Sequence, residues 1–226
     1  MSSQIPQPEE LEHIYARRFD GETAYRLRVW KVLVDHFFSR YIEPEACVLD
    51  LGCGYGEFIN NIRARRKYAM DMNPGARAFV AEGVTFLEQD SSETWPLPPE
   101  SLDVVFTSNF FEHLDGKRAL CDTLRQAHRC LRSQGRIIAM GPNIRYTKGA
   151  YWDFFDHHVP LTELSLKEAM EINGFRTELL VPRFLPYTMV NAPRYPAGFL
   201  KVYLSLSFLW HLFGQQFLVI ASRIRG

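Results

Sequence analysis

The sequence predicts an α/β fold in which a mostly parallel β-sheet lies between layers of helices. Short apolar runs alternate with amphipathic segments along the chain, which is typical of βαβ units. A glycine-rich turn also joins the first of these runs to the segment that follows it. With 226 residues, of which 46% are hydrophobic, the chain is expected to form one domain over residues 1–226.

The N-terminal part of the chain is expected to be helical. Candidate helices cover residues 9–19 and 22–42, and in the second one apolar side chains recur every fourth position from Tyr25 to Tyr41. We interpret residues 1–45 as a helical preface to the sheet.

The apolar runs that follow are the predicted strands. They lie at residues 47–51, 68–72, 84–87, 102–107, 136–140, 175–181 and 217–222. The predicted helices between the earlier strands lie at residues 57–66, 74–82 and 116–132. A further helix is expected to begin with a capping box of Ser165 and Glu168 and to stop at Gly174.

The glycine-rich turn at residues 52–56 (GCGYG) follows the first predicted strand. Glycines let the backbone turn tightly and approach a ligand closely, although a plain βα turn would use them as well. A dinucleotide-binding turn has a third glycine three residues after the second, and here that position is Glu57, expected at the entrance of a helix. Together with Asp50, this acid would repel a pyrophosphate and favour a cationic ligand.

Two further acids follow later strands. Asp71 lies nineteen residues beyond Gly52, where an acid commonly bonds the hydroxyls of a ribose, although it could instead cap a helix before Pro74. Asp90 follows the third predicted strand, where it could accept from an adenine amino group or be an ordinary loop acid.

Charge and cysteine content bear on partners and compartment. Lys plus Arg and Asp plus Glu number 26 each, so the chain lacks the bulk positive field that attracts nucleic acid, and no nucleic-acid partner is expected. The four cysteines form no CxxC pair, and the polar N-terminus does not have the pattern of a signal peptide. These features favour a cytoplasmic protein.

Three stretches carry a family resemblance: VLDLGCGYGEF at 48–58, AMDMNP at 69–74 and QDSSETWPLPPESLDVVFTSNFFEHL at 89–114. They resemble the class I, small-molecule type of S-adenosylmethionine-dependent methyltransferases. The resemblance implies a Rossmann-like three-layer sandwich with a seven-stranded sheet whose last strand is antiparallel. It also implies a cofactor-binding half over residues 46–142 and an acceptor-binding and C-terminal sheet half over residues 143–226.

S-adenosylmethionine is the cofactor that this resemblance implies, and S-adenosylhomocysteine is its product. The methionine portion would lie at the glycine turn, the ribose at Asp71, the adenine at Asp90 and the methyl group near Asn109. The implied cofactor-binding residues are Asp50, Gly52, Cys53, Gly54, Asp71, Met72, Asp90, Ser91 and Asn109.

Methyl transfer mainly requires donor and acceptor to be held in line, and a general base helps if the acceptor is an alcohol. Three histidines are candidates for that base: His113, His157 and His158. We favour His113, because it follows the fourth strand at the carboxyl edge of the sheet, although a Glu-His pair there could simply cap or pack. No metal ligand is expected.

Other functions could use the same residues. Glu112, His113 and either His157 or His158 could ligate a metal, which would resemble the RNA 3'-end methyltransferases that carry a Glu-Glu-His-His site. The chain could instead be a non-catalytic module that binds S-adenosylmethionine. A dehydrogenase is disfavoured by Glu57.

The acceptor is expected to meet aromatic residues late in the chain. Segments 151–155 and 184–199 could wall a pocket or belong to the core. Residues 198–213 are apolar nearly all round but too few to span a bilayer, so we expect them to be buried or to meet lipid. We expect a small-molecule or lipid-linked acceptor, such as an oxygen of a sugar or glycan precursor, and peripheral contact of 198–213 with the inner membrane face.

Overall fold

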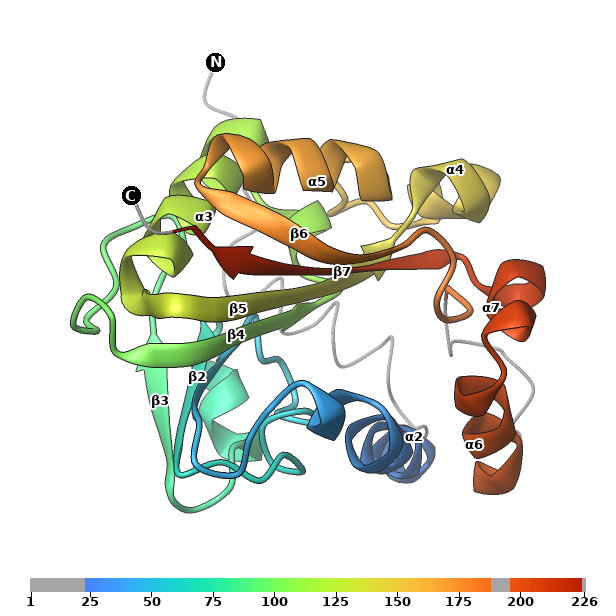
Figure 1. The fold of residues 1–226 in the computed structure, drawn as a ribbon, viewed down its shortest axis with the longest axis horizontal. Coiled ribbons are helices and arrows are strands. Elements are labelled where there is room, and N and C mark those ends of the chain that lie inside the picture. The colour runs from blue at the N-terminus through green and yellow to red at the C-terminus, as the bar shows by residue number, and fades with distance from the viewer. Residues whose placement is uncertain (1–22, 188–195, 225–226) are drawn as a thin grey trace.

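The computed structural model describes residues 23–187 and 196–224, and its centre is a seven-stranded sheet with helices on both faces (Figure 1). The strands are β1 (Cys47–Leu51), β2 (Arg66–Asp71), β3 (Val84–Glu88), β4 (Leu102–Ser108), β5 (Leu131–Pro142), β6 (Phe175–Val181) and β7 (Gln216–Arg223). Their order in the sheet is β3-β2-β1-β4-β5-β7-β6, and β7 runs antiparallel to both of its neighbours. The predicted Rossmann-like α/β fold with an antiparallel last strand is therefore confirmed.

The helices surround this sheet unevenly. They are α2 (Thr23–His36), α3 (Lys117–Cys130), α4 (Ile144–Thr147), α5 (Glu163–Ile172), α6 (Ala197–Ser205) and α7 (Ser207–Phe213), with 3-10 turns η1 (Phe38–Arg40), η2 (Pro74–Phe79), η3 (Phe111–His113) and η4 (Lys148–Asp153). Helices α3 and α5 cover one face and α2 the other, while α6 and α7 stand beyond the carboxyl ends of the parallel strands (Figure 1). The predicted helix at 9–19 lies outside the described residues, and the single-domain organisation over 1–226 stays a prediction.

The central strands are buried on both faces, because each face is covered by a helical layer. Alternate side chains of a strand point to opposite faces. On β4, Val104 and Phe106 pack in the cluster that includes α2, while Val105 packs in the cluster that includes α3 and α5. This explains why the strands appear in the sequence as nearly continuous apolar runs.

The predicted helix at 57–66 is wrong. After one turn, closed by the N–H of Asn60 on the carbonyl of Gly56, the chain bends and then enters β2. The Asn60 side chain donates to the carbonyl of Phe79 (2.8 Å) and accepts from the N–H of Ala81 (2.9 Å). Such side-chain bonds to distant backbone compete with helix propagation.

Other helices differ from the prediction at their boundaries. The segment 22–42 ends its α-helix at His36, and 74–82 forms only the 3-10 turn η2. Ser165 is not the N-cap of α5: Thr162 is, because its Oγ1 accepts from the N–H of Ser165 (3.1 Å) and the Ser165 hydroxyl accepts from the N–H of Thr162 (2.9 Å). The capping box therefore lies three residues earlier than predicted.

A cluster of aromatic side chains packs η1 against the sheet. Phe38 is 0% exposed and its ring lies 5.0 Å from that of Phe106 on β4 and 6.1 Å from that of Phe58. The rings of Phe58 and Phe106 stack at 3.6 Å. Burial of these rings is what attaches the N-terminal layer to the strands that carry the site.

Replacing Phe38 by alanine should lower the free energy of unfolding by about 3–5 kcal/mol, since it leaves a cavity among buried rings. Denaturant titration followed by circular dichroism measures this loss. Phe155→Ala is the matched control, because Phe155 is 88% exposed and its loss should cost less than about 0.5 kcal/mol. Equal effects of the two changes would contradict the assigned packing.

Candidate functional site

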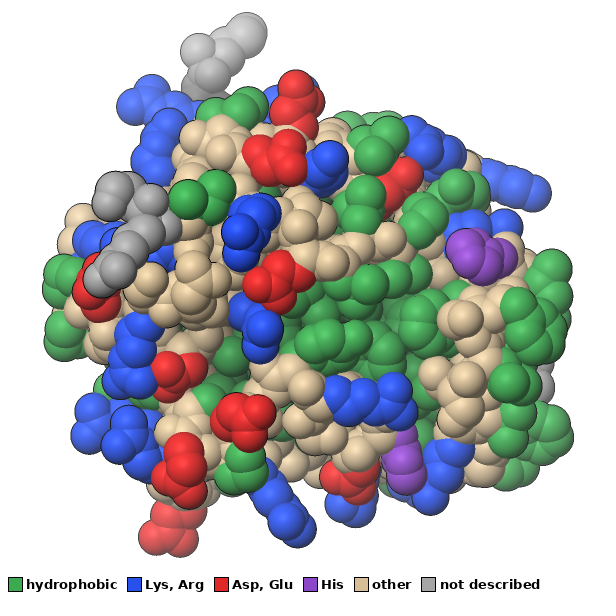
Figure 2. All heavy atoms as spheres, in the orientation of Figure 1, with side chains coloured by type: hydrophobic (Ala, Val, Ile, Leu, Met, Phe, Trp, Pro, Cys, Tyr) green, Lys and Arg blue, Asp and Glu red, His purple; other side chains and the backbone are tan. Residues whose placement is uncertain are grey.

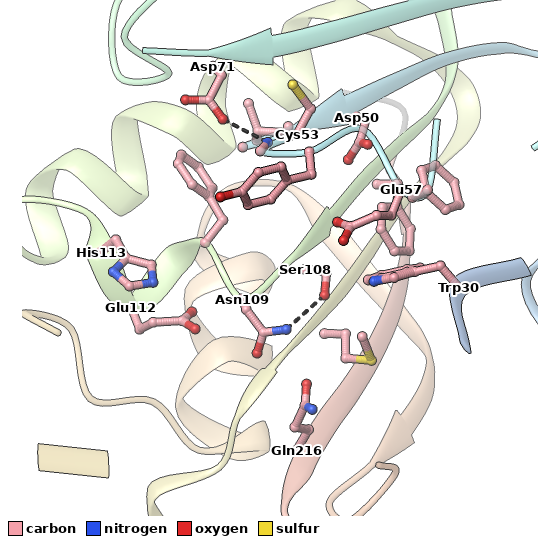
Figure 3. A pocket seen from close by; sticks show the side chains of 18 of the residues that line it. Trp30, Asp50, Cys53, Glu57, Asp71, Ser108, Asn109, Glu112, His113 and Gln216 are labelled. Atoms are coloured by element: carbon pink, nitrogen blue, oxygen red, sulfur yellow. Dashed lines mark hydrogen bonds between the residues drawn. The ribbon is translucent and has the colours of Figure 1, made fainter. Parts of the chain in front are cut away.

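A large cavity lies at the carboxyl ends of the parallel strands. Its volume is about 1230 Å³, and it is lined by the loops after β1 to β4, by α2 and by α6 and α7. Pockets for a single small molecule commonly measure ~300–1,000 Å³. This cavity therefore has room for two ligands side by side. Figure 3 shows the side chains of the glycine-loop end facing those of Asn109 and Glu112 across the same space.

The glycine loop forms one wall of the cavity. Gly52, Gly54 and Gly56 have φ angles of +68°, +48° and +67°, which side chains rarely adopt. A Cβ atom on Gly54 would have no neighbour within 4 Å, so this glycine borders open space. A Cβ atom on Gly52 would lie 2.3 Å from the Phe110 ring. The loop thus needs glycine for its conformation, and at Gly54 it leaves room for a ligand.

The N–H groups of this loop are bonded within the protein. Those of Gly52 and Cys53 donate to the carbonyl of Met70 (2.9 and 3.1 Å), and that of Gly54 donates to Asp71 Oδ2 (2.9 Å). A loop that binds phosphate offers its N–H groups to the ligand instead. The geometry therefore fits a ligand without phosphate at this wall.

Asp50 and Glu57 lie beside the loop, and only one of them has a basic partner here. Glu57 forms an ion pair of 2.6 Å with Arg26 of α2. Burial nevertheless raises the pKa of Glu57, because it outweighs the effect of Arg26. Burial, with the charges of Glu57 and Asp71, raises the pKa of Asp50 well above its usual range, although the backbone N–H of Ile59 opposes this.

The predicted role of Glu57 is therefore wrong in part. Glu57 does not stand at a helix entrance, and Arg26 balances its charge. Asp50 and Asp71 are the other acids at this wall that could interact with a cationic ligand. The sequence could not identify Arg26 as the partner of Glu57, because the two residues meet only when α2 packs beside the glycine loop.

The Asp71 carboxylate links the glycine loop to the end of β2 through hydrogen bonds. Its two carboxylate oxygens accept from the N–H groups of Gly54 and Asn73, both at 2.9 Å. Burial raises its pKa, and the bonds from these N–H groups oppose the shift. The cap before Pro74 is Asn73, not Asp71. Binding of a ribose by Asp71 stays a prediction.

Asp90 and Ser91, which the resemblance places at the adenine, and Met72, a further implied cofactor residue, lie at the same cavity wall. Asp90 Oδ1 accepts from the N–H and the hydroxyl of Ser92, both at 2.8 Å, and the Ser91 hydroxyl pairs with that of Thr123 (2.9 Å). The Ser91 side chain is thus directed at α3, so its backbone is the better candidate for a ligand contact.

Asn109 follows β4 with a φ of +49°, the left-handed conformation that asparagine tolerates better than most residues. Its N–H donates to the carbonyl of Met140 (2.9 Å) and its Nδ2 to the Ser108 hydroxyl (3.0 Å). These bonds hold the backbone of Asn109 at the cavity wall, and its place near the methyl group stays a prediction.

The three candidate histidines all line the cavity. His113 Nδ1 lies 3.1 Å from both the side chain and the carbonyl of Asp156. Burial lowers the pKa of His113, but the bond to Asp156 and the nearby charge of Glu112 outweigh it, so the net pKa is raised. A raised pKa favours the imidazolium, which cannot accept a proton.

His157 and His158 come from the segment that crosses over η3. His157 Nδ1 lies 3.0 Å from the carbonyl of Tyr151, and its ring lies 4.8 Å from that of His113. His158 is exposed, and its N–H donates to the carbonyl of Glu112 (2.7 Å). The structure therefore brings all three candidate histidines to one cavity, and a catalytic role for any of them stays a prediction.

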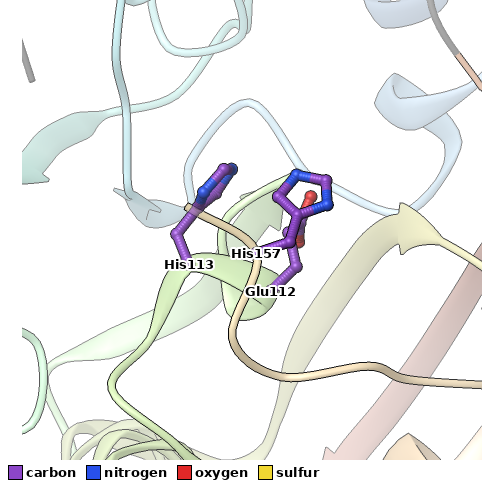
Figure 4. Close-up of side chains that lie close together, drawn as sticks. All are labelled: Glu112, His113 and His157. Atoms are coloured by element: carbon purple, nitrogen blue, oxygen red, sulfur yellow. The ribbon is translucent and has the colours of Figure 1, made fainter. Parts of the chain in front are cut away.

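Glu112 was predicted only as a possible metal ligand, yet its side chain lines the cavity (Figure 3), as does Asp156, which is bonded to His113. It is 3% exposed, and burial raises its pKa to about 7 while the charge of His113 lowers it. Ligand atoms of Glu112, His113 and His157 lie within 4.8 Å of one another (Figure 4). Atoms that share one zinc ion lie about 3.3 Å apart at bond lengths of ~2.0 Å, so these three are spread wider than a formed site.

The comparisons with known proteins agree with this geometry. A family model described as a methyltransferase domain matches residues 23–180. No curated protein matches the chain.

Solved structures share the fold at low sequence identity. A SAM-dependent methyltransferase from Archaeoglobus fulgidus is 24% identical, with a TM-score of 0.67, over 94% of this chain and 99% of that one. The partner of the Trm112 methyltransferase activator in a Haloferax volcanii complex is 16% identical (TM-score 0.69; 99% and 100% covered). The geranyl diphosphate C-methyltransferase of Streptomyces coelicolor, in complex with S-adenosylhomocysteine, is also 16% identical (TM-score 0.58; 87% and 76% covered).

Replacing Asp71 by asparagine should weaken binding of S-adenosylhomocysteine by roughly 10- to 100-fold, because an amide offers one acceptor to two N–H groups and a charged hydrogen bond contributes ~1.5–3 kcal/mol. Titration calorimetry measures the change. Glu88→Gln is the control: Glu88 pairs with Asp71 across the sheet but is exposed, so affinity should stay as in the wild type. Unchanged affinity in a folded Asp71→Asn protein would remove Asp71 from the site.

Proposed function

This chain belongs to the methyltransferase-domain family, and from that premise we propose that it methylates an oxygen of a small-molecule or lipid-linked acceptor, such as a sugar or glycan precursor. It is a class I enzyme that uses S-adenosylmethionine, whose methyl carbon is activated by its sulfonium leaving group. The observation that supports an oxygen acceptor is the Glu112 carboxylate, which borders the cavity opposite the glycine loop (Figure 3).

The glycine-loop end of the cavity suits the methyl donor. Asp50 and Asp71 supply negative charge for a ligand that carries a sulfonium and an ammonium group. Open space at Gly54 leaves room for the ligand against the backbone. The loop's internally bonded N–H groups agree with a donor that has no phosphate.

The other end of the cavity is apolar and suits the acceptor. It is lined by Phe154, Leu185, Leu200, Leu209 and Phe213 from segments after β5. Ligand sites are lined mainly by such side chains, with few polar groups to orient the ligand. This lining supports an acceptor that carries an apolar part next to its reactive hydroxyl.

We assign Glu112, and not a histidine, as the general base. As the new bond forms between the acceptor oxygen and the methyl carbon, the carbon–sulfur bond breaks and the hydroxyl proton passes to Glu112. A base works best when its pKa lies near the working pH, and the pKa of Glu112 is raised to about 7.

His113 then acts as a positioning residue. Held by Asp156 and with a raised pKa, it is a cation beside Glu112, where it favours the ionised carboxylate. His157 packs on the His113 ring and keeps it in place. His158 anchors the backbone of Glu112 through its N–H and stays a candidate contact for the acceptor.

The cluster of Glu112, His113 and His157 keeps a metal-assisted RNA 3'-end methyltransferase as a second candidate. A metal-dependent enzyme would lose its activity to a chelator and would recover it with a divalent cation. The function we propose requires activity that withstands the chelator. A non-catalytic binding module would bind S-adenosylmethionine but transfer no methyl group.

The acceptor can be sought by incubating the enzyme with labelled S-adenosylmethionine and separate lipid and aqueous cell extracts. We expect label in a molecule that contains both an apolar part and a sugar, with mass spectrometry placing the methyl group on oxygen. Methyl transfer to nitrogen, or to RNA alone, would contradict the proposal.

Replacing Glu112 by glutamine should lower kcat by roughly 10²- to 10⁴-fold and leave the affinity for S-adenosylhomocysteine unchanged. In the wild type, kcat should rise with pH through about 7, as Glu112 loses its proton, and this rise should vanish in the variant. His113→Gln is the comparison: as a positioning change it should lower kcat less and shift the rise to higher pH. If His113→Gln instead abolished activity and Glu112→Gln did not, His113 would be the base.

Acidification should weaken the binding of S-adenosylmethionine more than that of S-adenosylhomocysteine. The pKa values of Asp50 and Asp71 are raised, so these acids take up protons at a higher pH than ordinary carboxyls and then no longer attract the sulfonium. Calorimetry of both ligands between pH 8 and pH 5 tests this. Equal loss for the two ligands would contradict an effect of these acids on the sulfonium, because both ligands carry the ammonium group.

A further inference from the structure

Helices α6 and α7 present an apolar face to solvent. We call it the apolar rim and define it by Val202, Leu206, Phe208, Leu212 and Phe213, whose exposed fractions lie between 40% and 62%. Figure 2 shows apolar side chains gathered at the edge of the molecule that these helices form, where charged side chains are sparse. Single exposed apolar residues are normal, but a contiguous group marks a site of interaction.

The opposite face of the two helices fixes the rim in place. Leu204 is buried, and α6 packs on α2. Trp210 of α7 donates to the carbonyl of Tyr203 (2.9 Å), and its ring packs on that of Phe184 at 5.1 Å. Arg183 donates to the carbonyls of Leu212 and Gly214 at the end of α7. The rim is thus the outer side of a packed structure.

The predicted single segment 198–213 is broken at Leu206, which has φ −116° and ψ 85°. Next to this break the Ser205 hydroxyl donates to the carbonyl of Lys201 (2.9 Å), a bond that bends helices. Within residues 23–187 and 196–224, the structure contains no helix with the length and apolarity to cross a membrane. Two short helices in series are suited to lie along a surface.

The rim is continuous with the acceptor end of the cavity. Val202 and Phe213 belong to both, and Leu200, Tyr203 and Leu209 continue the same lining inward. A molecule held against the rim would therefore meet the cavity without crossing a charged surface.

The charges of the C-terminal segment favour a partner with an anionic surface. The last 48 residues of the chain contain no Asp or Glu and five basic residues, of which Lys201 is exposed on α6 and Arg183 bonds the end of α7, whereas Arg223 pairs with Glu100 at the far end of β7. Because the whole chain is formally neutral, the preceding 178 residues carry an equal excess of acids. Apolar side chains combined with basic residues and no acids are typical of segments that lie on anionic lipid.

We propose that the apolar rim docks on an anionic phospholipid surface and that the acceptor enters the cavity from that surface. The side chains of the rim insert at the boundary between headgroups and acyl chains, and Lys201, which is exposed on α6, meets the headgroups. Entry of the acceptor rests on the function proposed above, whereas docking itself does not and is tested on the protein alone.

The test is co-sedimentation of the full chain with vesicles of phosphatidylcholine and with vesicles of equal parts phosphatidylcholine and phosphatidylglycerol. We expect binding to the mixed vesicles that is at least tenfold stronger than to phosphatidylcholine and that weakens with salt. Leu206→Ser, Phe208→Ser and Leu212→Ser together should lower binding at least tenfold. These three side chains do not line the cavity, so affinity for S-adenosylhomocysteine should be unchanged.

The matched control replaces three exposed apolar residues elsewhere: Leu164→Ser and Ile172→Ser on α5 and Ile224→Ser after β7. This variant should bind vesicles as the wild type does, and thermal melts of both variants check that they fold. Absence of vesicle binding, or equal binding by wild type and rim variant, would overturn the proposal. So would a dimer in light scattering that the rim variant dissociates, because the rim would then be covered by a second copy.

Failure of docking and failure of the proposed function are separable. A protein that binds vesicles but not S-adenosylhomocysteine supports docking and contradicts the function. A protein that binds S-adenosylhomocysteine but not vesicles leaves the methyltransferase intact and removes the lipid surface as its partner.

Discussion

The carboxylate of Asp71 accepts from the N–H groups of Gly54 and Asn73, so the end of β2 fixes the glycine loop that follows β1. Much of the cofactor end depends on this bond. It holds Gly54 at the border of open space, and it uses an N–H group that a phosphate would otherwise need. The same acid lies close to the buried Asp50, whose pKa is raised by burial and by the charges of Glu57 and Asp71 and would be lowered by a cation bound beside it. The Asp71 carboxylate therefore affects both the conformation of the glycine loop and the kind of ligand that the loop can bind.

The cavity joins two environments of opposite character. At the glycine loop, burial raises the pKa values of Asp50 and Asp71, and a cation bound beside these acids would lower them. Towards α6 and α7 the lining is apolar and continues onto the rim. Glu112 lines the same cavity although it is buried, and in our proposal it takes the proton of the acceptor. The two ends of the cavity therefore suit a cationic donor and an acceptor with an apolar part.

The strands could be predicted because a strand that is covered by helices on both faces appears in the sequence as a short, nearly continuous apolar run, as at 102–107 for β4. The helix at 57–66 could not be excluded, because its failure comes from Asn60 bonding to backbone twenty residues away. Nor could the partner of Glu57 be found: Arg26 reaches it only through packing of α2. For the site, the order of the strands placed the three candidate histidines at the edge of the sheet where the cavity lies, but our proposal of Glu112 over His113 required their burial and the position of Asp156.

The central claim is that the cofactor end of the cavity binds a cationic, phosphate-free donor. Calorimetric titration of the purified chain with S-adenosylmethionine, S-adenosylhomocysteine and NAD tests it most directly. The account predicts saturable one-to-one binding of both sulfur ligands and none of NAD. Binding of NAD, or of neither sulfur ligand, by a folded protein would contradict it.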